Sequence, residues 1–410
     1  MSRMQQNLKE DLKNSINRRN YVLIISMTVV LMALSLTCWF KKEETFSKSE
    51  RRALEKFPGI SLEDVMNGTF MEEFEKYSLD QFPFRDKFRS LKAMTSYGIF
   101  GKKDNNDIYL AEGHLSKMEY PMQTKMLDHA AMRIQDIYDM YLKEHENTCY
   151  FSIVPDKNFF LAKENGYLSM DYETLISYMR EKVDFAEYID ISGFLSLEDY
   201  YRTDTHWRQE KITDVAEYLK KVMLTEENID SSSIMSEHGA EISSELSAEE
   251  KAGSHMDGNY EMKELEIPFY GVYSGQSALP VKPDKLFYLD NEILRQCKVS
   301  SYDTGKAKET VLYNMDKAYG NDPYEIFLSG TSALQVIENP LAVQEKELIV
   351  FRDSFGSSLV PLLVDGYSKI TVIDTRYVQS KILGNLVEFQ DQDVLFIYST
   401  MILNNSMSLR

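Results

Sequence analysis

The longest apolar stretch of the chain lies near its N-terminus. Residues Tyr21–Phe40 contain no charged side chain, and twenty helical residues at about 1.5 Å each reach roughly 30 Å, the thickness of a bilayer's hydrocarbon core. Five basic and two acidic residues precede this stretch, and an excess of positive charge favours a cytoplasmic N-terminus. The pattern therefore predicts a transmembrane anchor over Tyr21–Phe40.

A cleaved signal peptide is the alternative interpretation of the same stretch. However, its apolar run is longer than the apolar region of most signal peptides, and no A-x-A-like cleavage site follows it. We therefore expect an uncleaved anchor, in a single-pass protein of the cell membrane whose C-terminal domain is extracellular.

Beyond about residue 105, short apolar runs alternate with longer amphipathic stretches. The short runs are rich in β-branched and aromatic residues and predict strands at Thr148–Val154, Phe185–Ile191, Glu347–Phe351, Lys369–Ile373 and Val394–Tyr398. Apolar residues at helical spacing predict helices at Lys125–Glu144, Tyr172–Arg180, Gln209–Met223, Ser358–Val364 and Val378–Phe389. This alternation is typical of βαβ units and predicts an α/β sandwich with a parallel sheet.

Two segments interrupt this alternation and set the expected organisation. Thr225–Glu261 is rich in Ser and Glu and predicts an exposed insertion, whereas Ile267–Tyr319 has short aromatic alternations that predict a small inserted β subdomain. We therefore expect a cytoplasmic tail, an anchor, a helical juxtamembrane lead-in, a first part of the sandwich, the acidic insertion with its β subdomain, and a second part of the sandwich. Their boundaries are 1–20, 21–40, 41–105, 106–224, 225–320 and 321–410.

The charge of the outer part excludes some partners. The whole chain has a formal net charge of −19, and residues 1–42 contribute +5, so the rest carries −24. Such an acidic domain opposes binding to nucleic acid and non-specific binding to anionic lipid. Only Cys149 and Cys297 lie outside the anchor, which is too few for a disulfide framework, and the pattern leaves open whether they pair.

The strongest local signal for chemistry is the segment from Glu347 to Ser358, where an apolar strand ends in a polar turn and a helix opens. In an open parallel sheet this junction lies at the carboxyl edge, where ligands bind. Ser354 would be exposed there, and Gly356 would permit a tight backbone with N–H groups facing an oxyanion. A serine hydroxyl needs an adjacent base to act as a nucleophile. The alternative interpretation makes Ser354 an ordinary helix N-cap.

A second signal is the segment Tyr201–Trp207, in which Asp204 and His206 are two positions apart. In an extended loop such residues project to the same side, so a carboxylate could orient the imidazole while the other ring nitrogen accepts a proton. The alternatives are an N-cap aspartate beside a structural histidine, or two metal ligands. No third ligand stands at metal-ligand spacing, so we predict neither a metal nor another cofactor. A similar pair, His255 and Asp257, falls in the Ser- and Glu-rich segment.

Together these motifs resemble those of a known family. Asp204-Thr-His206-Trp207 and Arg352-Asp-Ser354-Phe-Gly356 look like the DHHW proteins, relatives of the AlgX and AlgJ polysaccharide O-acetylation proteins. Further segments resemble the family in the same order, so the resemblance extends from about Ser47 to the last predicted strand. These segments are Ser49–Pro58, Asp80–Arg85, Val154–Lys157, Asp322–Gly330 and Ile373–Tyr377.

The resemblance implies an SGNH-hydrolase-like, flavodoxin-like three-layer sandwich in which the triad has a permuted order along the chain. Ser354 would take an acetyl group, His206 would act as base and then as acid, and Asp204 would orient the imidazole. The acceptor would be a hydroxyl of a cell-surface polysaccharide. In related systems a multi-pass membrane acyltransferase brings the acetyl group across the bilayer.

The resemblance also suggests weaker candidates for contacts with the substrate or the oxyanion, namely Gly330, Gly356, Trp207, Arg376 and Tyr377. Their alternative roles include a turn glycine, a surface cation and a packed aromatic ring. Two positions depart from the pattern, since Arg352 stands where a glycine often precedes the serine and Thr331 stands where asparagine is common. An esterase with the same triad, and a non-catalytic glycan-binding or scaffold component, therefore remain as alternative functions.

Overall fold

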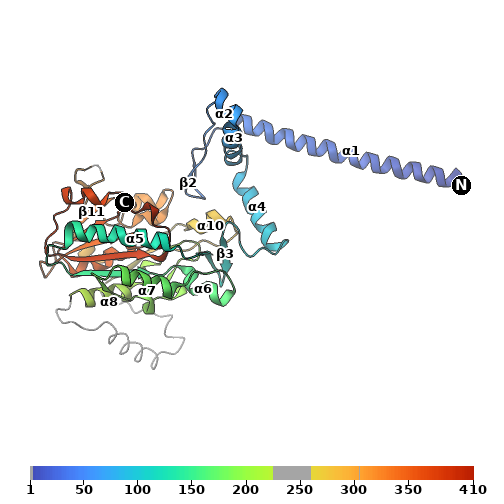
Figure 1. Cartoon of the computed structure of the whole chain (residues 1–410). Helices are drawn as coiled ribbons and strands as arrows, with labels where there is room; N and C mark the ends of the chain where they lie inside the picture. Colours follow the sequence, from blue (N-terminus) through green and yellow to red (C-terminus); the bar gives the residue numbers. More distant parts are fainter. Residues whose placement is uncertain (1–2, 225–259, 304) are drawn as a thin grey trace. The chain divides into compact units, whose positions relative to one another are not determined.

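The computed structural model describes residues 3–224, 260–303 and 305–410, which form two compact units (Figure 1). The first unit ends at Thr95 and the second extends from Ser96 to Arg410. The Ser- and Glu-rich insertion predicted over residues 225–261, with its His255 and Asp257, lies outside the described residues except for its last two positions.

The first unit begins with the long helix α1 (Arg3–Phe40), which extends the predicted anchor toward the N-terminus. Its apolar part, Ser15–Cys38, is long enough to cross a membrane and has no buried residue, so its length and composition suit either a membrane span or a signal sequence. A short hairpin and three helices follow. These are β1 (Phe46–Ser47), β2 (Arg52–Ala53), α2 (Leu62–Asn67), α3 (Thr69–Asp80) and α4 (Arg85–Gly98), the last of which runs across the unit boundary.

An eight-stranded sheet forms the centre of the second unit, in the order β10-β9-β11-β13-β12-β14-β5-β6. Five neighbouring strands are parallel, namely β13 (Lys369–Ile373), β12 (Glu347–Arg352), β14 (Asp393–Ser399), β5 (Cys149–Val154) and β6 (Glu187–Tyr188). The other three are antiparallel to their neighbours, namely β11 (Leu334–Glu338), β9 (Lys298–Ser301) and β10 (Lys308–Thr310). The five predicted strands are confirmed and form a parallel part of the sheet, but three antiparallel strands extend it, so the sheet as a whole is mixed.

Apolar residues cover both faces of the central strands, which explains why these strands appear in the sequence as continuous apolar runs. Leu348 and Val350 of β12 belong to the cluster that includes Val215 of α8 (Thr213–Leu224). Ile349 and Phe351 face the other way, into the cluster formed with α5 (Thr124–Ile137) and α7 (Tyr172–Lys182). Helices therefore pack on both sides of one sheet (Figure 1).

The predicted helices are confirmed at three places and differ at two. The segment Ser358–Val364 is α-helical only through α12 (Gly356–Leu359) and continues as a 3₁₀-helix over Val360–Gly366. Pro361 accounts for this change because it has no N–H for an i→i−4 hydrogen bond. The prediction of an α-helix over Val378–Phe389 is wrong, since only Ser380–Asn385 is helical and it is a 3₁₀-helix.

Part of the predicted β subdomain belongs to the central sheet. β9 and β10 extend the sheet beyond β11, while β7 (Glu261–Glu264) and β8 (Phe287–Asp290) form a separate two-stranded sheet. The other strands and α-helices that the structure describes in the second unit are β3 (Ile108–Ala111), β4 (His114–Lys117), α6 (Lys157–Asn165), α10 (Val272–Ser277), α11 (Glu292–Gln296) and α13 (Thr400–Asn404). Cys149 and Cys297 are free thiols, and burial raises their pKa to about 12 and about 11.

The parallel strands end at a common edge. β5, β12, β13 and β14 run in one direction, so the residues that follow their carboxyl ends meet there. These residues are Asp156 and Lys157 after β5, Asp353 and Ser354 after β12, Asp374 after β13, and Thr400 after β14.

Candidate active site

Ser354 lies in the tight turn between β12 and α12, and the neighbouring Asp353 fixes the shape of this turn. The Asp353 carboxylate accepts hydrogen bonds from the amide of Phe355 at 2.9 Å and from the amide of Ser399, at the end of β14, at 2.7 Å. Ser354 itself is half-buried. It is not an N-cap, because α12 is preceded by Phe355 in helical conformation and has no side-chain cap.

The structure brings Ser354, His206 and Asp204 into one chain of hydrogen bonds. His206 Nε2 lies 2.8 Å from Ser354 Oγ, and His206 Nδ1 lies 2.6 Å from Asp204 Oδ1. Asp204 is fully buried and His206 nearly so. Since both nitrogens of His206 are engaged in this way, the arrangement does not favour the alternative in which Asp204 and His206 hold a metal.

Asp204 is held from its other side by the start of α10. Its Oδ2 accepts a hydrogen bond from the amide of Val272 at 2.8 Å. A Cβ on Gly271 would lie 2.3 Å from the Cα of Asp204, so only glycine permits this approach. Thr203 Oγ1 also accepts from the Gly271 amide at 2.9 Å. The sequence analysis missed this support, because a backbone amide contributed from 68 positions away leaves no motif.

Two buried aromatic residues fix the loop of His206 against α12. The ring of Tyr324 stacks on the imidazole with the centroids 3.9 Å apart, and its hydroxyl donates to Ser358 Oγ at 2.9 Å. Trp207 Nε1 lies 3.0 Å from both Ser358 Oγ and the carbonyl of Phe355. Trp207 is fully buried, so its place is in the support of the site and not on a substrate-facing surface.

The amide of Ser354, which the sequence analysis did not predict as an oxyanion donor, differs from the amides of the two predicted glycines, Gly330 and Gly356. It makes no hydrogen bond with any residue that the structure describes. The Gly356 amide donates to the Asp353 carbonyl at 3.1 Å, and the Gly330 amide donates to the Phe327 carbonyl at 3.0 Å. The Ser354 amide is therefore the donor that a developing oxyanion could use without breaking another bond.

Both glycines have packing roles. A Cβ on Gly356 would lie 2.7 Å from the Cβ of Arg352, so glycine lets the Arg352 side chain pass beneath the turn. Gly330 has a φ of +87°, a conformation that favours glycine, and the side chain of Glu325 would meet a Cβ there at 3.0 Å.

The basic residues near the ends of β12 and β13 share one carboxylate. Arg376 Nε and Nη2 lie 2.9 and 2.6 Å from the two oxygens of Asp374, and Arg352 Nη1 lies 3.4 Å from Asp374 Oδ2. Arg352 is buried, and burial lowers its pKa. Arg376 is therefore largely committed to Asp374, while the ring of Tyr377 is half-exposed beside it.

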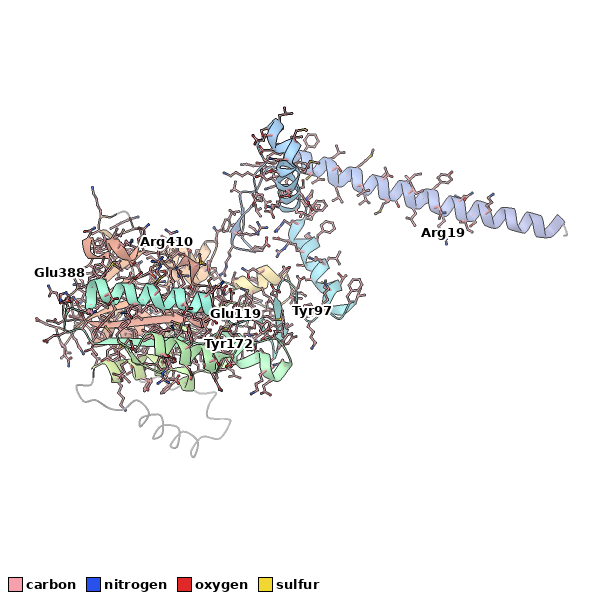
Figure 2. All side chains as sticks on the ribbon, in the orientation of Figure 1. Arg19, Tyr97, Glu119, Tyr172, Glu388 and Arg410 are labelled. Atoms are coloured by element: carbon pink, nitrogen blue, oxygen red, sulfur yellow. The ribbon has the colours of Figure 1, made fainter. Side chains whose placement is uncertain are left out.

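A buried lysine lies beneath the Asp204 loop. Lys157 Nζ donates to the carbonyl of Tyr201 at 2.9 Å and lies 5.0 Å from the ring centroid of Tyr273. Burial lowers the pKa of this amine to about 7, against the opposing effect of Asp204 and two other aspartates. The preceding Asp156 is also buried, and it accepts a hydrogen bond at 2.8 Å from the hydroxyl of Tyr172, which Figure 2 labels. The sequence motif included Lys157 but gave it no role.

A Ser, a His and an Asp in one chain of hydrogen bonds form the arrangement of serine hydrolases and serine-dependent acyltransferases. Here this arrangement lies at the carboxyl edge of the central sheet in a mixed α/β fold.

Solved structures share this fold. A DHHW family protein from Eubacterium siraeum DSM 15702 is 17% identical, with a TM-score of 0.54 over 75% of this chain and 95% of that one. PatB1 from Bacillus cereus is 18% identical, with a TM-score of 0.52 over 72% of this chain and 96% of that one, and another structure of PatB1 has a sulfonyl adduct. The chain therefore shares its fold with a DHHW family protein, the family that its motifs resemble.

The O-acetyltransferase domain of Pseudomonas putida AlgJ is 13% identical over 72% of this chain and 92% of that one. Its TM-score of 0.39 is too low to establish a common fold. No protein-family model matches the chain, and no curated protein matches its sequence.

Proposed function

We propose that this protein is a membrane-anchored, extracytoplasmic O-acetyltransferase that modifies hydroxyls of a cell-surface or secreted polysaccharide through an acyl-Ser354 intermediate. The observation that carries the proposal is the 2.8 Å contact between His206 Nε2 and Ser354 Oγ, with Asp204 on the other imidazole nitrogen. A serine hydroxyl becomes a useful nucleophile when a base is placed in this way.

In the first half of the reaction, Ser354 Oγ attacks the carbonyl carbon of an acetyl donor while its proton passes to His206 Nε2. The tetrahedral intermediate carries its negative charge on the former carbonyl oxygen, toward which the Ser354 amide can donate. When this intermediate collapses, the bond to the donor's leaving group breaks and the leaving group takes the proton from His206. The products are acetyl-Ser354 and a neutral imidazole.

In the second half, a polysaccharide hydroxyl attacks the acetyl-Ser354 carbonyl and gives its proton to His206 Nε2. Collapse breaks the bond to Ser354 Oγ, which recovers its proton from the imidazolium. Asp204 keeps Nδ1 protonated in both halves, so that Nε2 faces Ser354 as the acceptor. Water in place of the sugar hydroxyl would make the same site an esterase.

We propose that the reaction takes place outside the cytoplasm, on the far side of a membrane anchor formed by α1. Positive charge before residue 21 favours a cytoplasmic N-terminus, so the chain that follows α1 would face outward. Acetyl groups made in the cytoplasm would then have to cross the bilayer, and we propose a multi-pass membrane acyltransferase as the partner that delivers them. The acidic outer domain is poorly suited to nucleic acid.

An assay of the full-length protein on an acetyl ester separates the candidate functions. We expect acetyl transfer to an oligosaccharide by the wild type and a loss of at least about 10³-fold in Ser354→Ala, as in other serine triads. Ser300→Ala, a half-buried serine of β9, is the control and should keep its activity. Turnover with water as the sole acceptor would replace the transferase with an esterase. Equal rates for wild type and Ser354→Ala would contradict both enzymes and favour a scaffold role.

A further inference from the structure

Helix α4 carries an exposed apolar stripe. Phe88, Leu91 and Met94 are 44%, 56% and 53% exposed, and Phe84, just before the helix, is 59% exposed. The spacing of three residues places Phe88, Leu91 and Met94 along one side of the helix. Ala93, on the opposite side, is fully buried. The helix therefore has a buried face and an apolar face that contacts solvent.

Two exposed lysines lie on or beside this stripe. At 100° per residue, Lys87 projects between Leu91 and Met94, within the stripe, whereas Lys92 lies just beyond Phe88 at its edge. Lys87 Nζ lies 5.7 Å from the ring centroid of Phe84. The inward-facing Arg85 and Arg89, in contrast, lie 2.6 and 3.1 Å from the carboxylate of Glu50. Asp86, the acidic residue of α4, is exposed as well, but it lies 3.7 and 3.6 Å from Arg85 and Arg89, so Lys87 and Lys92 are the exposed charges close to the apolar residues.

We propose that α4 lies in the headgroup region of the membrane and binds anionic lipid, with Phe84, Phe88, Leu91 and Met94 inserted at the interface. An apolar face with one lysine within it and one at its edge suits this position, because the lysine stems cover apolar surface while the ammonium groups reach the lipid phosphates. Phe84 lies 44 positions after Phe40, the last residue of α1. An anchor of this kind keeps the bilayer at a high effective concentration for a neighbouring helix.

The exposed apolar residues of α2 do not fit anionic lipid equally well. Leu62 and Met66 of α2 are 82% and 81% exposed, but α2 carries Glu63 and Asp64 and has no basic residue. Since the chain beyond residue 42 has a net charge of −24, an anionic surface repels most of the outer part. Helix α4 combines exposed apolar residues with exposed positive charge, which makes it suited to overcome that repulsion locally.

Site-specific labelling of the full-length protein in vesicles tests this proposal. Leu91→Cys is labelled with a polarity-sensitive fluorophore after Cys38 and Cys297 are changed to serine, and Glu72→Cys on the acidic helix α3 is the matched control. In vesicles containing phosphatidylglycerol, we expect the label at position 91 to shift to a less polar environment and to be quenched by doxyl-labelled lipid. The label at position 72 should remain in water.

The lysines give a second, independent measurement. One lysine near an anionic surface changes the binding equilibrium about fivefold, so Lys87→Gln with Lys92→Gln should weaken the interfacial state up to about 25-fold and remove its preference over phosphatidylcholine. A label at position 91 that stays in water in both lipids would overturn the proposal. A shielded label that doxyl lipid does not quench would also overturn it, in favour of a protein partner on α4.

Discussion

At the scale of single residues, the site depends on buried polar groups whose partners come from distant parts of the chain. Asp204 illustrates this, since its two oxygens contact His206 and the amide of Val272. Lys157 stabilises the same loop by donating a hydrogen bond to the carbonyl of Tyr201. A buried amine of this kind links the stability of the fold to pH.

We predict that Lys157 makes the folded protein more stable as pH rises above 7. Burial lowers the folded-state pKa to about 7, whereas an unfolded lysine titrates near about 10.4. Between these values the unfolded chain holds a proton that the folded chain lacks, so this group adds up to about 1.4 kcal/mol of unfolding free energy per pH unit. The slope should be missing in Lys157→Met.

Denaturant unfolding of both proteins between pH 7.5 and about 9.5 measures this difference. The nearby charges that face Lys157 are Asp156, Asp204 and Asp284, and they remain in the variant, so subtracting the two curves isolates the lysine. Parallel curves for Lys157→Met and the wild type would show that the amine stays charged in the folded state.

The roles of Ser354, Asp204 and His206 could be proposed from the sequence because each residue lies in a short motif. Ser354 follows an apolar strand directly, and Asp204 stands two positions before His206. Tyr324, Gly271 and Val272 could not, because their roles exist only through contacts made across the fold. An aromatic ring stacked on an imidazole and a glycine beside a carboxylate have no local pattern.

At the scale of elements, the central parallel strands were predictable and the antiparallel ones were not. β5, β12 and β14 are buried along almost their whole length and appear as apolar runs. β10 is the edge strand of the sheet and β9 lies next to it, and the two strands include Lys298, Ser300, Lys308 and Glu309. Half-exposed edge strands of this kind lack the apolar run, so their segment looked like a separate subdomain.

The close approach of α10 to the Asp204 loop gives a prediction at this scale. In Gly271→Ala the new Cβ would meet the backbone of Asp204, so α10 must move and the Val272 hydrogen bond to Asp204 must lengthen. We expect a stability cost of about 1–3 kcal/mol from overpacking and a fall in kcat of about 100-fold, since a shift of about 1 Å at a catalytic group can have this effect.

The matched control is Gly59→Ala in the first unit, where nothing lies within 4 Å of a new Cβ. It should keep both the activity and the melting temperature of the wild type. If Gly271→Ala turned over substrate as fast as Gly59→Ala, the contact between α10 and Asp204 would have no part in positioning the carboxylate.

At the scale of the whole molecule, the proposed function requires a defined topology across the membrane. Exposed Val343 in the second unit and exposed Lys13 before the apolar part of α1 are suitable reporters. In intact cells, a membrane-impermeant maleimide should label Val343→Cys and leave Lys13→Cys unlabelled until the cells are lysed. The reverse pattern would place the site in the cytoplasm and would contradict the proposed substrate.

The central claim is that His206 makes Ser354 a nucleophile, and trapping the covalent intermediate tests it most directly. The full-length protein is mixed with an acetyl ester, quenched with acid and analysed by intact mass and peptide mapping. The wild type and Ser300→Ala should each gain one acetyl group on the peptide containing Ser354, whereas Ser354→Ala should gain none. An acetyl group that maps to another residue, or that persists in Ser354→Ala, would contradict the account.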